Sequence, residues 1–180
     1  PQSKLATARS WTHSTLGEWF DVEGADEDAL YGAMDWLLER QEAIERRLAK
    51  RHLSEGARVL YDLSSSYFEG ETCPLAARGY SRDGKRGTLQ VNYGLLTDAR
   101  GCPVAISTFA GNTGDPQTLM AQVEKLRGDF ALQSVVLVGD RGMISHKQVA
   151  ALRDAGGVEW ITALKSGAIG KLVESGGIRM

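Results

Sequence analysis

Between residues 57 and 164 three strand-like segments are followed by segments that alternate between helix and strand. Few folds have elements in this order. ARVLYDLSSSYF (57–68), TLQVNYGLLT (88–97) and CPVAISTFA (102–110) are rich in β-branched and aromatic residues, a composition that favours strands. The DARG turn (98–101) separates the last two segments closely enough for a hairpin. These segments therefore predict three consecutive strands that pair as an antiparallel meander.

Helical segments alternate with strands in the second half of this region. SVVLVG (134–139) is a short apolar run, typical of a strand buried on both faces, and VEWITAL (158–164) predicts one more strand. Helices expected at residues 116–130 and 145–157 precede these strands, and a strand that is linked to the next by a helix runs parallel to it. We therefore expect a mixed α/β sheet flanked by helices, which is a ribonuclease-H-like arrangement rather than an all-parallel Rossmann sheet.

The two linking helices have start and stop signals in the sequence. Asp115 is suited to an N-cap and Pro116 to the first helical position. Ser145 and Gln148 have the spacing of a capping box, and Gly156 is suited to ending the second helix. These signals predict where each helix begins.

The N-terminal part of the chain has a different pattern. Residues 1–24 are aromatic and polar without a sustained period, so we expect mostly irregular chain there. Acidic residues at 26–28 then precede apolar residues at helical spacing, which predicts an amphipathic helix over residues 27–52. We expect two parts, an N-terminal segment with this helix (1–55) and a partial ribonuclease-H-like catalytic core (56–180).

Composition narrows the classes of protein. A formal charge of −2 over 180 residues argues against a dedicated nucleic-acid-binding domain, so local basic clusters must carry any DNA contact. Cys73 and Cys102 have no CxxC spacing, which argues against a disulfide scaffold and a zinc site. The chain shows neither a signal peptide nor an apolar run long enough for a bilayer, so we expect a cytoplasmic protein without a membrane partner.

Two aspartates stand out because their neighbours are apolar. Asp62 lies between Tyr61 and Leu63 within a strand, and Asp140 directly follows the strand at 134–139. A buried carboxylate is costly unless a cation or hydrogen-bond donors meet it. Structural explanations are a bond from Asp62 to backbone or to a basic side chain, and a helix cap or an ion pair with Arg141 for Asp140.

The functional explanation is a shared metal site. In the expected sheet the strand of Asp62 neighbours the strand before Asp140, so both carboxylates can converge on one cation, roughly 4 to 7 Å apart. Two Mg²⁺ or Mn²⁺ ions held by oxygen ligands catalyse phosphoryl transfer. The three histidines fall in unrelated segments, which argues against a histidine-based mechanism.

Basic residues near these strands are candidates for DNA contact. Arg78, Arg82, Lys85 and Arg86 form the clearest basic cluster, which could hold DNA phosphates or form an ordinary solvated loop. Arg141 follows Asp140 directly and could steady a carboxylate or a phosphate.

Five motifs occur in a recognisable order. They are YDLSSSYFEG (61–70), RGYSRDGKRG (78–87), QVNYGLL (90–96), FAGNTGD (109–115) and VGDRGMIS (138–145). Together they resemble the DDE transposases of bacterial insertion sequences, in the group typified by insertion sequence four. The resemblance covers residues 30 to 164, approximately. It implies that Asp62 and Asp140 are the first and second catalytic aspartates and bind the Mg²⁺ or Mn²⁺ ions.

The resemblance also implies a third acid. In this group it is a glutamate in a motif of Tyr, two residues, Arg, three residues, Glu, six residues and Lys. No Tyr follows Tyr93, and Glu174 lacks that context. We therefore expect the third acid beyond Met180, and we expect the chain to be an inactive piece of a longer transposase.

The intact protein implied by this resemblance cleaves transposon ends and joins them to target DNA. It would bind double-stranded DNA, work as a homodimer and associate with the bacterial nucleoid. Two alternatives remain open from the sequence. One is a ribonuclease-H-like nuclease or resolvase that cuts without strand transfer, and the other is a fragment without catalysis that binds DNA or protein.

Overall fold

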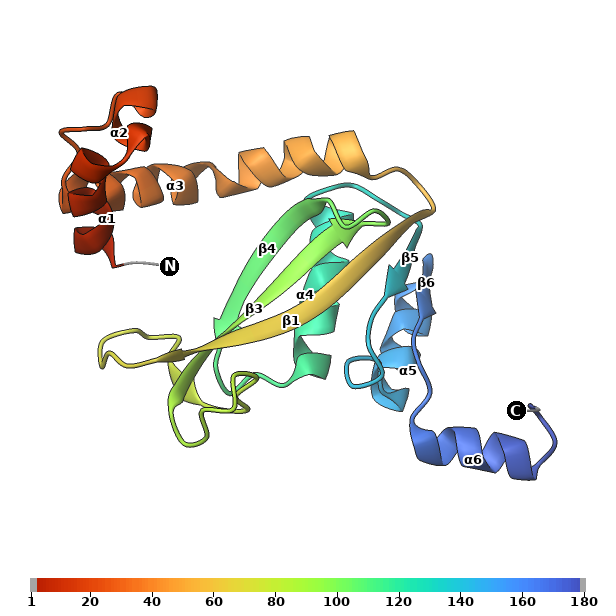
Figure 1. Ribbon diagram of the computed structural model, residues 1–180. Coiled ribbons are helices and arrows are strands. Elements are labelled where there is room, and N and C mark those ends of the chain that lie inside the picture. The colour runs from red at the N-terminus through yellow and green to blue at the C-terminus, as the bar shows by residue number, and fades with distance from the viewer. Residues whose placement is uncertain (1–2, 179–180) are drawn as a thin grey trace. The chain divides into compact units, whose positions relative to one another are not determined.

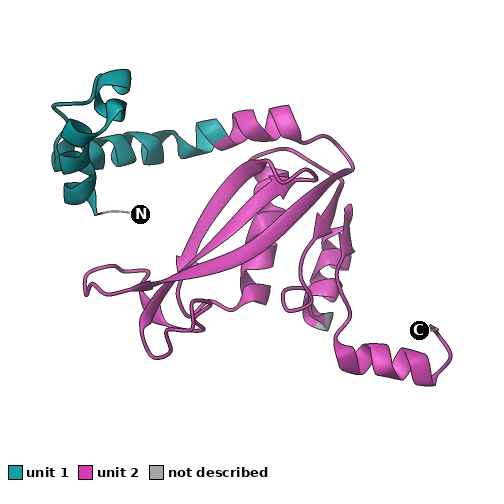
Figure 2. Cartoon of the chain, in the orientation of Figure 1, with its two compact units in different colours: residues 1–44 teal, residues 45–180 magenta. Residues whose placement is uncertain are grey.

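The computed structural model describes residues 3–178, apart from the side chain of His146, and the chain divides between Ile44 and Glu45 into two compact units (Figure 2). The first unit contains helix α1 (Lys4–Ser10), the 3-10 helix η1 (Trp11–His13), helix α2 (Thr15–Phe20) and the first part of helix α3 (Glu27–His52).

The helices before residue 21 replace the mostly irregular chain expected for residues 1–24, so that expectation is wrong for the described residues. α1 has 7 residues and α2 has 6, which is less than the two to three turns over which an apolar period becomes visible. A local cap begins α1, because the Ser3 hydroxyl accepts a hydrogen bond from the Ala6 N–H at 3.1 Å.

The long helix predicted for residues 27–52 is confirmed with the same bounds as α3. Asp26 Oδ1 accepts a hydrogen bond from the Ala29 N–H at 2.9 Å, and Glu27 and Asp28 lie in the first turn, where negative charge is favourable. None of the helices within the described residues is both long enough and apolar enough to cross a membrane.

The second unit is built on a mixed sheet (Figure 1). Its strands are β1 (Ala57–Phe68), β2 (Ala77–Arg78), β3 (Leu89–Asp98), β4 (Pro103–Ala110), β5 (Val135–Val138) and β6 (Val158–Ile161). β3 pairs antiparallel with β1, β2 and β4, whereas β5 pairs parallel with both β1 and β6. The predicted meander, the ribonuclease-H-like mixed sheet and the adjacency of β1 and β5 are confirmed. Only β2 was not expected, since two residues carry no period.

The two faces of the sheet have different environments. Val59, Tyr61 and Leu63 on one face of β1 are buried in the core with side chains of helices α4 (Asp115–Gly128) and α5 (His146–Ala155). Figure 1 shows both helices on the same side of the sheet. Residues on the opposite face are open, with Leu95 39% and Ile106 47% exposed. The candidate residue Asp62 alternates with the buried residues and therefore belongs to this open face.

The helix starts differ in detail from those expected. Gly114, not Asp115, is the N-cap of α4, and Pro116 is the second helical residue rather than the first. The Gly114 N–H donates to Gln117 Oε1 at 3.3 Å. Because Asp115 is not needed as a cap, its carboxylate is available for a tertiary contact.

Helix α5 begins after Ser145, as predicted, but the Ser145 side chain does not cap a backbone N–H. Its hydroxyl instead donates a hydrogen bond to Gln148 Oε1. A further helix, α6 (Ser166–Glu174), was not expected from the sequence, and it includes Glu174.

The close approach of Gly94 to a core tyrosine gives the first testable prediction. A Cβ added at Gly94 would lie 2.2 Å from Tyr61 Oη and 2.5 Å from its Cε2. We expect Gly94→Ala to lower the free energy of unfolding by about 1–3 kcal/mol, because overpacking shifts the core. Guanidinium-induced unfolding measures this. Gly128→Ala is the control, since a Cβ there meets no atom within 4 Å; because Gly128 is a residue of α4, this change should leave stability unaltered or raise it by up to about 1 kcal/mol. Equal losses in the two variants would contradict the prediction.

Candidate functional site

The two candidate aspartates line the same cleft on the open face of the sheet. This cleft has a volume of about 470 Å³ and is formed by residues 60–62, Leu95, Thr97 and residues 138–140. Asp62 and Asp140 are its acidic members, and both side chains are exposed. The structure therefore brings together residues that are far apart in the sequence.

Strand pairing explains why these residues meet. Leu60 and Val138 form the last backbone pair between β1 and β5, and each aspartate lies two residues beyond its member of that pair. Period-two alternation places Tyr61 in the core and Asp62 on the open face. The expected cost of burying the Asp62 carboxylate therefore does not arise.

The two carboxylates differ in how they are held. Among the described residues, the Asp62 carboxylate has neither a hydrogen bond nor an ion pair, so both structural explanations considered for it are absent. Asp140 Oδ1 accepts hydrogen bonds from the N–H groups of Gly142 at 2.8 Å and Met143 at 2.9 Å. Its carbonyl oxygen accepts one from Thr162 Oγ1 at 3.0 Å. Asp140 is thus oriented by its own turn, whereas Asp62 is available to a ligand.

Tyr61 also lines the cleft, although its side chain is buried in the core. Burial raises the pKa of Tyr61 to about 12, the nearby Thr118 hydroxyl opposes this shift, and the charges of Asp115 and Asp62 add to it. The phenol therefore stays protonated at neutral pH, so the charge of the cleft comes from its two aspartates.

The basic cluster lies on the connection between β2 and β3, and its members have unequal surroundings. Arg82 is half-buried and forms an ion pair with Asp115 at the start of α4, and its N–H donates to Ser65 Oγ at 3.2 Å. Arg78, Lys85 and Arg86 are exposed. Sequence reasoning missed the partner of Arg82, because the two charges lie 33 residues apart.

Arg141 lines a second groove, next to the cleft of the two aspartates. This groove of about 300 Å³ is lined by Arg141, Trp160, Lys165 and residues of α5 and the start of α6. Arg141 is exposed and so has access to a ligand, although no described contact joins it to Asp140.

A separate group of possible metal ligands occurs at the β3–β4 turn. Nδ1 or Nε2 of His52, a carboxylate oxygen of Asp98 and Sγ of Cys102 lie within 4.8 Å of one another. Asp98 Oδ1 already accepts hydrogen bonds from the N–H groups of Arg100 at 2.8 Å and Cys102 at 2.9 Å, and Oδ2 accepts one from Arg100 Nη2 at 2.9 Å. The oxygens of Asp98 are thus engaged by the turn, which makes this group primarily structural.

The family profile described as transposase DDE domain matches residues 57–172. No curated protein matches the chain. The piggyBac transposase synaptic complex with hairpin DNA is 15% identical, with a TM-score of 0.44, and the match covers 63% of this chain and 24% of that one.

Two Mos1 transposase structures are also similar. The paired-end complex with the left transposon end is 12% identical, with a TM-score of 0.39 and coverage of 89% of this chain and 59% of that chain. The mariner paired-end complex with Mn is 11% identical, with a TM-score of 0.35 and coverage of 97% and 72%. The chain thus spans 24% of the first and 59% of the second of these structures.

The hydrogen bonds at Asp98 generate a prediction about acid stability. The N–H of Cys102 and the guanidinium of Arg100 lower the pKa of Asp98 from 3.8 to about 2. Since the folded-state pKa is depressed, ionised Asp98 stabilises the fold above pH 3.8, and this contribution is lost as the pH falls toward 2. Urea unfolding should show that Asp98→Asn loses less stability than the wild type over this range. Asp83→Asn, an exposed loop change, should follow the wild type; identical pH profiles for all three would exclude the proposed linkage.

Proposed function

We propose a function from one premise, which is that the chain belongs to the transposase DDE domain family, whose profile spans residues 57–172. On this premise residues 56–180 are the front part of a ribonuclease-H-like catalytic core. The intact protein is a DNA transposase that cleaves transposon ends and transfers them to target DNA. The observation that carries the proposal is the common cleft of Asp62, in the middle of β1, and Asp140, just beyond the end of the neighbouring strand β5.

The cleft suits a divalent cation. The transposase DDE domain family uses divalent metal ions. Hard cations such as Mg²⁺ and Mn²⁺ prefer oxygen ligands, and the acidic members of the cleft offer only carboxylate oxygens. The Asp62 carboxylate has no protein partner among the described residues, which leaves its lone pairs available. We propose that Asp62 and Asp140 hold Mg²⁺ or Mn²⁺, with two ions in the complete site.

The protein's own residues have distinct tasks in this mechanism. When bound, the two cations activate the attacking water or DNA hydroxyl and stabilise the leaving oxygen. Asp140 reaches the site in one orientation, because the N–H groups of Gly142 and Met143 fix its Oδ1. Asp62 projects from a central strand whose alternate residues are anchored in the core. Rigid support of this kind keeps the two carboxylates in register with each other.

The basic residues supply contacts to the DNA backbone in this proposal. Arg78, Lys85 and Arg86 are exposed and bind phosphates of double-stranded DNA, while Arg141 binds a phosphate beside Asp140. Arg82 positions the loop through its ion pair with Asp115 and is available to phosphate only at the cost of that pair. The intact protein binds transposon ends and target DNA as a homodimer at the bacterial nucleoid.

A third acid completes the site. Within the described residues, Asp62 and Asp140 are the carboxylates that line the cleft. We propose that a glutamate from a segment after residue 180 adds the third. With two acids alone, the 180-residue chain binds Mg²⁺ or Mn²⁺ weakly and does not cleave DNA at a useful rate, because misplacing reacting groups by about 1 Å can cost a hundredfold.

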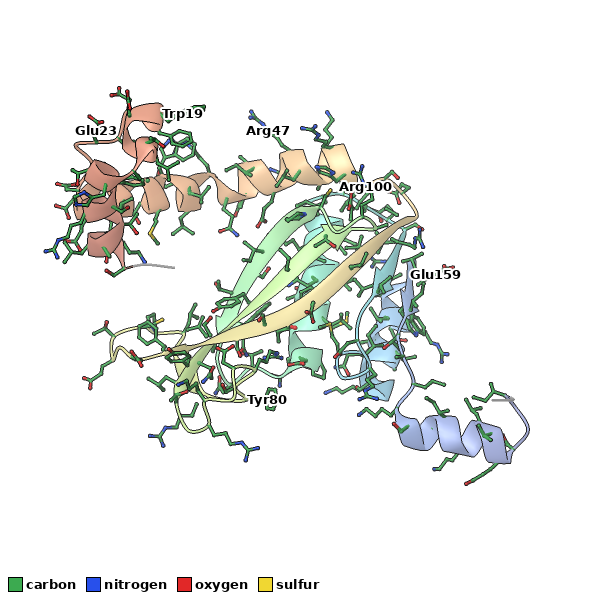
Figure 3. The ribbon with its side chains drawn as sticks, viewed as in Figure 1. Trp19, Glu23, Arg47, Tyr80, Arg100 and Glu159 are labelled. Atoms are coloured by element: carbon green, nitrogen blue, oxygen red, sulfur yellow. The ribbon has the colours of Figure 1, made fainter. Side chains whose placement is uncertain are left out.

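Cleavage assays test this function directly. The protein extended through the third acid is incubated with Mn²⁺ and DNA that carries the cognate ends, and cut and joined products are measured. Asp62→Asn and Asp140→Asn should each lower the rate by about a hundredfold or more, since each removes a charged ligand. Glu159→Gln is the control, because this exposed carboxylate of β6, labelled in Figure 3, is not one of the residues that line the cleft.

Three results of this assay would be decisive against parts of the proposal. Full activity after either aspartate is changed would refute the metal site. Cutting without joining would favour the nuclease or resolvase alternative. Strong cleavage by the short chain that depends on Asp62 would show that a carboxylate within residues 1–180 completes the site.

The phosphate contacts are tested by the salt dependence of binding. Each lost phosphate contact lowers the slope of log K against log salt by about 0.9 for duplex DNA. Combined Arg78→Ala, Lys85→Ala and Arg86→Ala should therefore flatten the slope by about 2 to 3 and weaken binding similarly for different sequences. Lys171→Ala, on the exposed surface of α6, is the control. An unchanged slope in the triple variant would mean that the loop is only solvated.

A further inference from the structure

A histidine, an aspartate and a cysteine meet where helix α3 ends beside the β3–β4 turn. One ligand atom of each of His52, Asp98 and Cys102 lies within 4.8 Å of the other two. Figure 3 shows Arg100, which belongs to this turn, next to the end of α3. The three side chains offer nitrogen, oxygen and sulfur, and a donor set that includes imidazole and thiolate suits Zn²⁺ better than Mg²⁺.

The β3–β4 turn fixes the aspartate and the cysteine relative to each other. Asp98 Oδ1 accepts hydrogen bonds from the N–H groups of Arg100 at 2.8 Å and Cys102 at 2.9 Å. The Asp98 N–H donates in turn to the carbonyl oxygen of Cys102 at 3.0 Å. Because these bonds use Oδ1 and the backbone, they orient the carboxylate and leave Oδ2 for side-chain partners. Hydrogen bonds of this kind orient carboxylates that bind metal ions.

Asp98 Oδ2 and the His52 ring share one positive charge. Arg100 Nη2 donates to Asp98 Oδ2 at 2.9 Å and lies 3.2 Å from His52 Nδ1. A guanidinium has only donors, so Nδ1 accepts this hydrogen bond and His52 is neutral, with its proton on Nε2. Neutral imidazole is the form that binds metal ions. The lone pairs of two candidate ligands therefore converge on a single cation.

The distance between these two ligand atoms fits a tetrahedral metal ion. His52 Nδ1 and Asp98 Oδ2 are 3.5 Å apart, and two atoms bound at about 2.1 Å to one tetrahedral Zn²⁺ are about 3.4 Å apart. The guanidinium that occupies this position is free to move away, because the Arg100 side chain is 72% exposed. The carboxylate of Asp98 and a thiolate of Cys102 together balance the two charges of the metal ion.

We propose that His52 Nδ1, Asp98 Oδ2 and Cys102 Sγ bind Zn²⁺ or a similar borderline divalent cation, with water as the fourth ligand. On binding, the metal ion takes the place of the Arg100 guanidinium, which moves into solvent. The Cys102 side chain turns toward the ion, and its thiol releases a proton to solvent. The ion then joins the last residue of α3 to the β3–β4 hairpin. This structural metal site goes beyond the proposed function.

The proposed zinc site is distinct from the aspartate cleft. Asp98 pairs with Val59, whose side chain is in the core, whereas Asp62 pairs with Leu95 on the open face. The two sites therefore belong to opposite faces of the sheet. Their donors differ as well, because the acidic members of the cleft offer only oxygen, which Mg²⁺ and Mn²⁺ prefer.

Cobalt(II) is a spectroscopic probe that tests this site. The reduced 180-residue chain is titrated first with Co²⁺ and then with Zn²⁺, and its absorption spectrum is recorded. We expect a thiolate-to-cobalt charge-transfer band in the near ultraviolet and four-coordinate d–d bands in the visible, all of which Zn²⁺ removes. Excess Mg²⁺ should leave the bands in place, because it competes only for oxygen ligands.

Single substitutions identify the ligands. Cys102→Ser should abolish the charge-transfer band, and His52→Ala should weaken Co²⁺ binding by about tenfold or more. Cys73→Ser is the matched control, because Cys73 is the other free cysteine and lies outside this group. It should keep the bands and the affinity of the wild type. Circular dichroism of each variant checks that the fold is kept.

Arg100→Ala distinguishes a metal site from a cluster that only holds the turn. For a metal ion the change removes a competing cation, so the affinity for Co²⁺ should rise by about two- to fivefold. Thermal unfolding gives a second readout. A hundredfold excess of Zn²⁺ over its dissociation constant should raise the midpoint by about 5 °C or more in the wild type and Cys73→Ser, but not in Cys102→Ser.

Three outcomes would overturn the proposed zinc site. The first is a Co²⁺ spectrum without a thiolate band. The second is a band that is lost in Cys73→Ser and kept in Cys102→Ser, and the third is weaker Co²⁺ binding after Arg100→Ala. Asp62→Asn should leave the thiolate band unchanged, so failure of this inference is separable from failure of the aspartate cleft.

Discussion

The alternation of side chains along β1 is the constraint on which the rest of the second unit depends. This strand pairs with β3 on one side and with β5 on the other. Val59, Tyr61 and Leu63 are buried against the helices, so the residues between them must face the opposite side. A shift of one residue would bury Asp62 and expose the core, which makes this register strongly specified. Fold and candidate site are thus consequences of the same packing.

The cleft combines one fixed carboxylate with one that has no partner among the described residues. Asp140 is held by N–H groups of its own turn, whereas Asp62 relies on the strand that carries it. Two carboxylates that line one cleft repel each other, and a cation shared between them relieves this repulsion. The phenol of Tyr61, which also lines the cleft, is neutral and adds no charge. The proposed metal site rests on this combination of one oriented carboxylate and one available carboxylate.

The basic residues in the connection between β2 and β3 have different surroundings: one forms an ion pair and another is exposed. Arg82 is engaged by Asp115, and this pair ties the loop to the start of α4. Lys85 stays exposed above the Tyr67 ring. Arg82 therefore holds the loop in place, while Lys85 remains exposed beside the Tyr67 ring.

Local order was readable from the sequence wherever an element was long enough to show its period. The helix at 27–52, the strand at 57–68 and the candidate residues Asp62 and Asp140 all followed from spacing, alternation and the recognisable motifs around them. The short helices before residue 21 and the two-residue strand β2 carry too few residues to show a period, so they could not be predicted.

Contacts between distant segments were decided only by the tertiary structure. No local sequence pattern indicates the ion pair of Arg82 with Asp115. The same is true of the group formed by His52, Asp98 and Cys102. Their geometry depends on which strands pair and in which register, because pairing brings together side chains from unrelated parts of the chain. The sequence by itself determined which residues alternate and where chemistry-bearing side chains stand along each strand. Only the folded sheet decided which of these side chains line the same cleft and which form ion pairs that hold a loop in place.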